Sequence, residues 1–354
     1  MTMKFSQFYM PYKLNRPLTQ QEKDYQLYQG KPTRLTGKTG EYMIEYDTVI
    51  RMNSTYMETV DKYYRNKGFV SSLFATSFFC CLGMDLFFMV DTILRCFNGD
   101  YKSLLGFFIF QPGGMVILYF SGKLILKEWF ATTHYPIRFN RKTQMIHVYR
   151  FNGTVLSVPW KDVFFTLTES RGRMKEWCID GHILADDQET VLDTFSLGFS
   201  EVFRELMPGY WEFIRCYMEE DGLQEQADII LLCPPIEQKK EGYIFGLQYL
   251  MRMNSRLDWF VELINFPFDL ITSIARYIAM QTSKIPKWPQ EVEDACQVDP
   301  NDLTNVSAAN NPVHLWRHIL ANQTLEEYQA INDRLSLAHA RLKEKIAMAH
   351  STDK

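Results

Sequence analysis

The sequence predicts an α+β membrane protein: a hairpin of two transmembrane helices, a small antiparallel β-barrel or sandwich followed by a helix, and further amphipathic and C-terminal helices. Three observations predict this class. Residues 69–94 and 104–122 are long and nearly uncharged, residues 133–200 alternate apolar and polar side chains, and a helical spacing of apolar residues follows. Because the mean hydropathy is only −0.22, most of the 354 residues must still meet water.

The changes in pattern along the chain predict five segments. They are a cytosolic N-terminal segment at 1–66, a transmembrane helical hairpin at 67–130, a β domain with a helix at 131–222, a connecting segment with an amphipathic helix at 223–300, and C-terminal helices at 301–354.

The N-terminal segment contains one clear helix start. Thr19 and Glu22 have the spacing of a capping box, in which each side chain bonds the backbone of the other residue, and we expect this helix to run to Gly30. The first residues contain no apolar run followed by a cleavage site, so they do not predict a secretory signal.

The hairpin is predicted from length and apolarity. Residues 69–94 carry only Asp85 and Asp91, and residues 104–122 carry no formal charge. A bilayer core of about 30 Å is spanned by about 20 helical residues. Both outer flanks of the hairpin carry more basic residues than the 95–103 loop does. Because basic residues favour the cytoplasmic side, this predicts that both termini face the cytoplasm.

Asp85 is the unusual residue of the hairpin. A charged carboxylate at mid-span costs about 2.5–3.5 kcal/mol on insertion scales. Folding the hairpin about Gly99 places Asp85 opposite Gly113, with Gln111 and Gly114 beside it. The structural hypothesis is a polar staple, in which Gln111 donates a hydrogen bond and the glycines permit close approach. The functional hypothesis is an ion or proton site.

The β domain is predicted from alternation and turns. Asn152-Gly153 separates two alternating runs, which is a strong hairpin signal, and several short strands follow. Residues 198–221 then become helical, with Pro208 expected to kink or break the helix near its middle.

The stretch at 259–280 is apolar but contains polar residues at regular intervals. Glu262, Asp269 and Arg276 are seven residues apart and fall on one helical face. This amphipathic pattern fits either an interfacial or re-entrant helix or a helix that packs in a soluble core. At the C-terminus, Thr324 and Glu327 predict the start of a long helix that ends near residue 349.

Composition and motifs exclude several function classes. With 38 Lys and Arg against 42 Asp and Glu, the chain lacks the basic excess of a nucleic-acid-binding domain. Its seven cysteines include no CxxC pair, which argues against a disulfide framework or a zinc site. The sequence shows no catalytic constellation, so it predicts a protein that is not an enzyme and that holds no cofactor or metal.

One stretch resembles a known family. "YPIRFNRKTQMIHVYRFNGTVLSVPWKDVFF" at 135–165, with "PKWP" and a later valine at 285–292, is similar to the hallmark motifs of an uncharacterised family of Gram-negative membrane proteins. The resemblance covers about residues 60–300. Genes of that family often lie beside type VI secretion effectors, especially pore-forming ones, and its architecture resembles a pleckstrin-homology-like domain after a membrane hairpin.

The resemblance implies an inner-membrane immunity protein whose partners are the bilayer and a cognate secreted toxin. The alternative is a lipid-sensing or scaffolding protein, in which four basic residues after the hairpin touch anionic headgroups: Arg138, Arg141, Lys142 and Arg150. These residues would otherwise be simple positive flanks. A third hypothesis, a channel or transporter subunit, requires a homo-oligomer because two spans are few.

Overall fold

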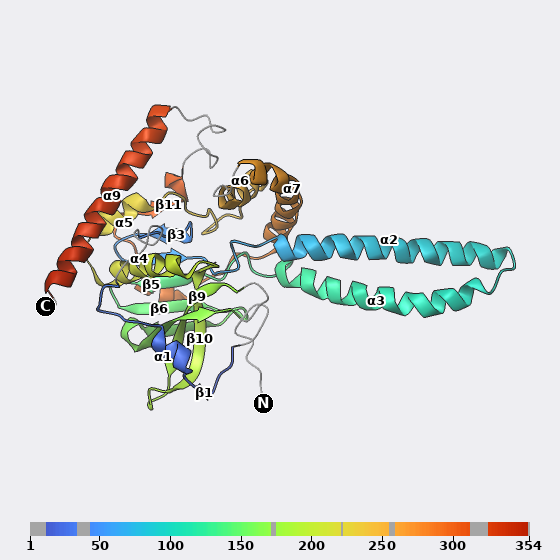
Figure 1. Cartoon of the computed structure of the whole chain (residues 1–354), viewed down its shortest axis with the longest axis horizontal. Helices are drawn as coiled ribbons and strands as arrows, with labels where there is room; N and C mark the ends of the chain where they lie inside the picture. Colours follow the sequence, from blue (N-terminus) through green and yellow to red (C-terminus); the bar gives the residue numbers. More distant parts are fainter. Residues whose placement is uncertain are drawn as a thin grey trace. The chain divides into compact units, whose positions relative to one another are not determined.

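The structure is a computed structural model that describes residues 12–33, 43–170, 175–220, 222–254, 259–311 and 325–352 (Figure 1). The chain divides into two compact units. Unit 1 comprises Met1–Tyr64, His134–Lys240 and Ile285–Lys354, and unit 2 comprises Arg65–Thr133 and Glu241–Lys284. Each unit is therefore assembled from segments that are separated in the sequence.

The first sheet of unit 1 is antiparallel and has the strand order β11-β3-β4-β5-β6-β7. Its strands are β3 (Val49–Met52), β4 (Tyr56–Thr59), β5 (Ile137–Asn140), β6 (Met145–Tyr149), β7 (Val155–Pro159) and β11 (Val306–Ser307). The predicted Asn152-Gly153 turn is confirmed, because Tyr149 pairs with Val155 across it. Gly153 has a φ of +80°, which glycine adopts without steric cost.

The second sheet of unit 1 is also antiparallel and has the order β1-β10-β9-β8-β2. Its strands are β1 (Arg16–Pro17), β2 (Gln26–Leu27), β8 (Val163–Glu169), β9 (Trp177–Leu184) and β10 (Thr190–Glu201). Both edge strands are short and come from the N-terminal segment.

The core of unit 1 lies among the two sheets and the helix α4 (Met207–Glu219). Alternate residues of the strands and most of α4 are buried there. Trp160 stacks on Trp211 of α4 with ring centroids 5.6 Å apart, and Phe165 and Phe139 contact the Trp160 ring. Burying aromatic side chains of this size is a large apolar contribution to stability.

Further helices complete unit 1. They are α1 (Gln20–Asp24), α5 (Leu223–Ile229), α8 (Gln290–Ala295), α9 (Leu325–Thr352) and the single 3-10 turns Trp160–Asp162, Arg204–Leu206 and Ala308–Asn310. Ala338 and Leu342 of α9 are buried in the core cluster of unit 1.

The described residues of unit 2 form four helices. They are α2 (Phe69–Phe97), α3 (Ser103–Glu128), α6 (Tyr243–Asn254) and α7 (Trp259–Thr282). Helices α2 and α3 form the long hairpin, and α6 and α7 lie at the end where α2 begins and α3 ends (Figure 1).

Two predicted helices have other bounds than the sequence indicated. The Thr19–Glu22 capping box is confirmed, but α1 ends at Asp24 because Gln26 and Leu27 pair with β8. The helix expected at 198–221 begins only at Met207, since Phe199 belongs to β10. Pro208 stands in the first turn of α4, where its missing N–H costs nothing. The expected cap at Thr324 lies outside the described residues.

The β domain predicted at 131–222 forms only part of unit 1. The sheets of unit 1 take strands from 16–59 and from 306–307 as well as from 137–201. Sequence alternation cannot find this, because the two-residue strands β1, β2 and β11 are too short to show a period. The α+β class is confirmed, and the pleckstrin-homology-like fold stays a prediction.

Candidate functional site

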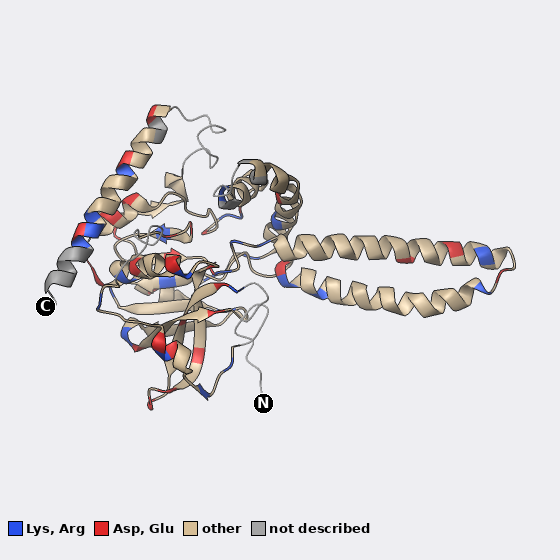
Figure 2. Cartoon of the chain, in the orientation of Figure 1, with Lys and Arg blue, Asp and Glu red and all other residues tan. Residues whose placement is uncertain are grey.

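The apolar hairpin is the first candidate. Among the described residues, α2 and α3 are long and apolar enough to cross a membrane, and the most apolar 18-residue window of each has none of its residues buried. Figure 2 shows that most charged residues of the hairpin lie near its two ends. Asp85 stands near the middle of α2. Exposed apolar patches of this extent mark surfaces that contact a partner or a bilayer.

The structure brings Asp85 against α3, at Gly114. A Cβ atom on Gly114 would lie 2.6 Å from Oδ2 of Asp85, so only glycine fits there without a shift. Gly113 has no neighbouring atom within 4 Å of such a Cβ and therefore faces away from α2. The Asp85 Oδ2 atom is buried without a hydrogen-bond partner among the described residues, so the expected bond from Gln111 is absent from them. The ion-site hypothesis stays a prediction.

Replacing each of the two adjacent glycines with alanine, one at a time, provides a matched test of this contact. Gly114→Ala should lower the thermal midpoint of the detergent-solubilised protein, because the new methyl group displaces the Asp85 carboxyl, at about 1 kcal/mol for such overpacking. Gly113→Ala should not lower the midpoint, because alanine favours a helix and no atom lies near its new methyl group, and Asp85→Ala should rescue Gly114→Ala. Equal effects of the two alanines would show that Asp85 and Gly114 do not pack together.

A group of polar side chains, here called the hairpin base, joins the start of α2 to the end of α3. The Glu128 carboxylate accepts hydrogen bonds from the backbone N–H groups of Gly68 and Ser71, at 3.2 and 3.1 Å. Lys67 Nζ donates to the carbonyls of Thr132 and Thr133, at 2.6 and 2.9 Å. A carboxylate at a helix N-terminus satisfies its open N–H groups and complements its dipole. The hairpin base therefore fixes where both helices begin and end.

Arg276 of α7 attaches that helix to the hairpin base. Its side chain is fully buried, and its guanidinium pairs with Glu241 at 2.5 Å and donates to the Arg65 and Lys67 carbonyls. A Cβ atom on Gly68 would lie 2.6–2.8 Å from the backbone and Cβ of Arg276, so the two segments cross in direct contact. The sequence had indicated the polar face of α7 but not this partner.

Three of the four basic residues proposed to touch headgroups have other contacts in the structure. Arg138 is only 4% exposed, and its guanidinium binds the Glu58 carboxylate between the rings of Tyr56 and Trp288. The membrane-surface interpretation of Arg138 is therefore wrong, since burial removes it from any headgroup. All four residues of β5 are buried, so both of its faces are covered, whereas an alternating pattern predicts one covered face.

The other three differ among themselves. Arg141 donates to the Tyr217 and Glu220 carbonyls at the end of α4, and Arg150 pairs with Asp193 at 2.7 Å. Lys142 is exposed. The structure thus does not gather the four into one basic surface, which removes the main support for the lipid-sensing hypothesis.

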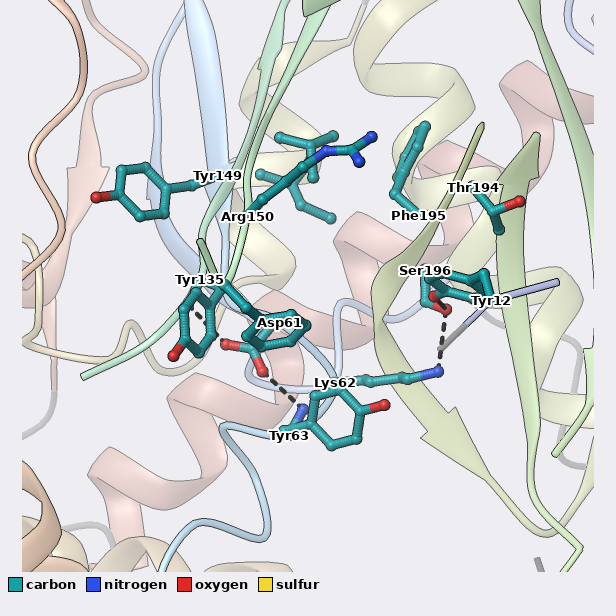
Figure 3. Close-up of a pocket in the computed structure, with 13 residues that line it drawn as sticks. Tyr12, Asp61, Lys62, Tyr63, Tyr135, Tyr149, Arg150, Thr194, Phe195 and Ser196 are labelled. Atoms are coloured by element: carbon teal, nitrogen blue, oxygen red, sulfur yellow. Dashed lines mark hydrogen bonds between the residues drawn. The ribbon is translucent and has the colours of Figure 1, made fainter. Parts of the chain in front are cut away.

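A pocket in unit 1 brings together residues that the sequence did not connect (Figure 3). Lys62, which appeared in the sequence only as a basic flank of the hairpin, extends its ammonium to the Ser196 hydroxyl at 3.0 Å. The Ser196 hydroxyl donates to the Asp180 carboxylate and also bonds the Tyr12 hydroxyl. No local motif could reveal this cluster, because its members lie on four segments distant in sequence.

The electrostatics of this pocket favour a fixed hydrogen-bond network. Burial lowers the pKa of Lys62, but the groups around it, Asp180 among them, outweigh burial and hold that pKa well above its ordinary value. A protonated Lys62 cannot take a proton from Ser196. Burial also raises the pKa of the Cys178 thiol to about 12, which keeps it in the unreactive neutral form. The cluster can thus link the segment after β4 to β9 and β10.

The hallmark motifs meet in a single contact region of unit 1. Arg138 of "PIRFNR" lies 4.9 Å from the ring of Trp288 in "PKWP", and the Asn140 side chain donates to the carbonyl of Ala295, the last residue of α8. Residues 114–300, more than half of the 354-residue chain, match a family of unknown function, DUF6708, and this match includes both motifs. No curated protein and no solved structure matches the chain. On the length of that match, the chain belongs to the DUF6708 family.

Proposed function

We propose that α2 and α3 anchor this protein in a bacterial inner membrane, with both termini in the cytoplasm. The observation that carries this proposal is the exposed apolar surface of the hairpin, which includes Phe87, Ile109, Phe110 and Val116. Each helix exceeds the length that a bilayer core requires. The excess of basic residues outside the hairpin supports the orientation.

We further propose that the anchored protein is a non-enzymatic immunity protein that binds a membrane-attacking toxin of a type VI secretion system. The resemblance of residues 135–165 to membrane proteins encoded beside such effectors supports this role. The positions of Arg138, Asn140 and Trp288 agree with it, because their side chains hold unit 1 together. A motif that maintains a scaffold suits a binding protein, whose partner contacts lie elsewhere on its surface.

A growth competition tests this function. Cells that lack the gene should be killed by sister cells that deliver the toxin, and the wild-type gene should restore survival. The double variant Phe87→Arg/Val116→Arg should lose both membrane association and protection, because each mid-span arginine costs about 2.5–3.5 kcal/mol. Phe203→Arg, at an equally exposed residue of unit 1, should retain both.

The two parts of the proposal fail separately. Full survival of the deletion strain would contradict the immunity role and leave the anchor intact. A double variant that still sediments with membranes would contradict the anchor.

A further inference from the structure

Helix α7 has the opposite polarity to a helix of a water-soluble protein. Its buried side chains include the polar residues Asp269, Thr272, Ser273 and Arg276. Its exposed side chains include the apolar residues Leu263, Ile264, Phe268, Ile271 and Ile274. A helix in water normally directs its apolar stripe inward and its polar face to solvent. The surroundings that match the outer face of α7 are therefore apolar.

Two residues of the buried polar face of α7, Ser273 and Arg276, have partners within unit 2. Arg276 pairs with Glu241 and lies over the ring of Tyr249 of α6, at 4.9 Å. The Ser273 hydroxyl bonds the Leu270 carbonyl and lies 3.3 Å from the Tyr243 hydroxyl. Because these contacts lock the polar side toward α6, α7 cannot rotate to bury its apolar side without leaving Arg276 and Glu241 unpaired.

The C-terminal end of α7 is bonded to the end of α3. The Thr282 hydroxyl accepts from the Phe130 N–H at 3.3 Å, and the Ser283 hydroxyl donates to the Glu128 carbonyl at 3.1 Å. This is the end of the hairpin where Lys123, Lys127 and Trp129 stand. Lysine and tryptophan are enriched where a transmembrane helix leaves the bilayer. The contacts therefore hold the C-terminal end of α7 beside these residues.

We propose that α7 is an in-plane helix that inserts its Leu263–Ile274 face into the lipid at the membrane surface. The inference rests on the proposed membrane anchor and adds a second, separate lipid contact to it. Apolar residues on an interfacial helix reach the boundary of headgroups and acyl chains, while the polar face stays above it. Here that polar face binds α6 and the hairpin base. In this arrangement α7 sets the orientation of unit 2 at the surface, which a two-helix hairpin alone leaves free to tilt.

Photocrosslinking to lipid tests the position of α7. A photoreactive p-benzoyl-phenylalanine is placed in the full-length protein at Phe268 of α7, Phe87 of α2 or Phe203 of unit 1, which are 66%, 68% and 65% exposed. Each protein is reconstituted into phosphatidylcholine vesicles that contain an alkyne-tailed phosphatidylcholine. Phe203 has the charged residues Glu201 and Arg204 close to it in the sequence. It is the control that shows how much labelling exposure alone produces. A second probe position at Ile271 covers the case in which the Phe268 variant fails to fold.

We expect strong lipid labelling at Phe268 and Phe87, and at least fivefold less at Phe203. Labelling at Phe87 with only the Phe203 level at Phe268 and Ile271 would overturn the in-plane helix and leave the anchor standing. Background labelling at all positions would overturn the anchor and the in-plane helix together. Equal labelling at Phe268 and Phe203 would also overturn the inference, because exposure would then explain it.

Discussion

Replacing Arg138 with methionine is expected to lower the free energy of unfolding by about 3–5 kcal/mol, the usual cost of removing one partner of a buried ion pair. Arg138 and Glu58 are 4% exposed each, and the guanidinium lies 4.7 Å from the ring centroid of Tyr56 and 4.9 Å from that of Trp288. In the variant the buried Glu58 carboxylate loses the guanidinium of Arg138 and keeps the hydrogen bond from Trp288 Nε1, at 3.2 Å. Urea denaturation followed by tryptophan fluorescence measures the change.

The pH dependence of this deficit identifies its cause. Burial raises the pKa of the Glu58 carboxyl, and Arg138 opposes that rise. Without Arg138 the folded state binds a proton at Glu58 more tightly than the unfolded chain does, so the deficit should shrink at low pH and grow as the pH rises through this pKa.

Two control variants accompany Arg138→Met. Glu58→Gln in the same chain should recover part of the loss, because it removes the unpaired charge. Lys23→Met, which breaks the exposed pair with Glu189, should cost less than about 1 kcal/mol. A deficit for Arg138→Met no larger than that of Lys23→Met would show that the buried contacts of Arg138 contribute little.

Gly68→Ala is expected to separate α7 from the hairpin base, at a cost of about 2–5 kcal/mol from backbone strain and overpacking together. Gly68 has a φ of +95°, and its new methyl group would lie 2.7 Å from the backbone nitrogen of Arg276. Backbone atoms of α7 cannot yield as a flexible side chain can. Amide hydrogen exchange should therefore accelerate throughout α7 in the variant.

The matched control for this prediction is Gly99→Ala. Gly99 has a similar φ of +85°, but no atom lies within 4 Å of its added Cβ. This variant should lower the free energy of unfolding only by the strain of an alanine in the left-handed conformation, about 1–2 kcal/mol. Amide hydrogen exchange in α7 should stay unchanged. If both variants accelerate exchange in α7 equally, backbone strain and not the crossing of α7 is responsible.

Features that depend on neighbouring residues were predictable from the sequence. The capping box at Thr19, the turn at Asn152-Gly153 and the two long apolar helices each follow from a pattern within one element. The sequence also predicts the neighbour of Asp85 to within one residue, Gly113 in place of Gly114. A short loop allows the two helices of a hairpin little freedom to shift along each other.

Features that depend on distant partners were not predictable. Arg138 was interpreted as a surface residue, since its partners Glu58 and Trp288 are 80 and 150 residues away. The same limit applies to Lys62, whose partner Ser196 lies 134 residues away. Alternation predicts one covered face of a strand, but both faces of β5 are buried because segments distant in sequence cover the second face.

The pairing of β4 with β5 limits how often the chain can cross the bilayer under the proposed membrane anchor. The two strands are neighbours in one sheet, although residues 65–133 of unit 2 separate them. Two strands can pair only on one side of a membrane, so the intervening segment must cross an even number of times, as a two-helix hairpin does. The pairing of β3 with β11 extends this parity across residues 241–284. With 12 residues, α6 is too short to cross. A single crossing by α7 would make the number of crossings between β3 and β11 odd. The two strands would then lie on opposite sides of the membrane and could not pair.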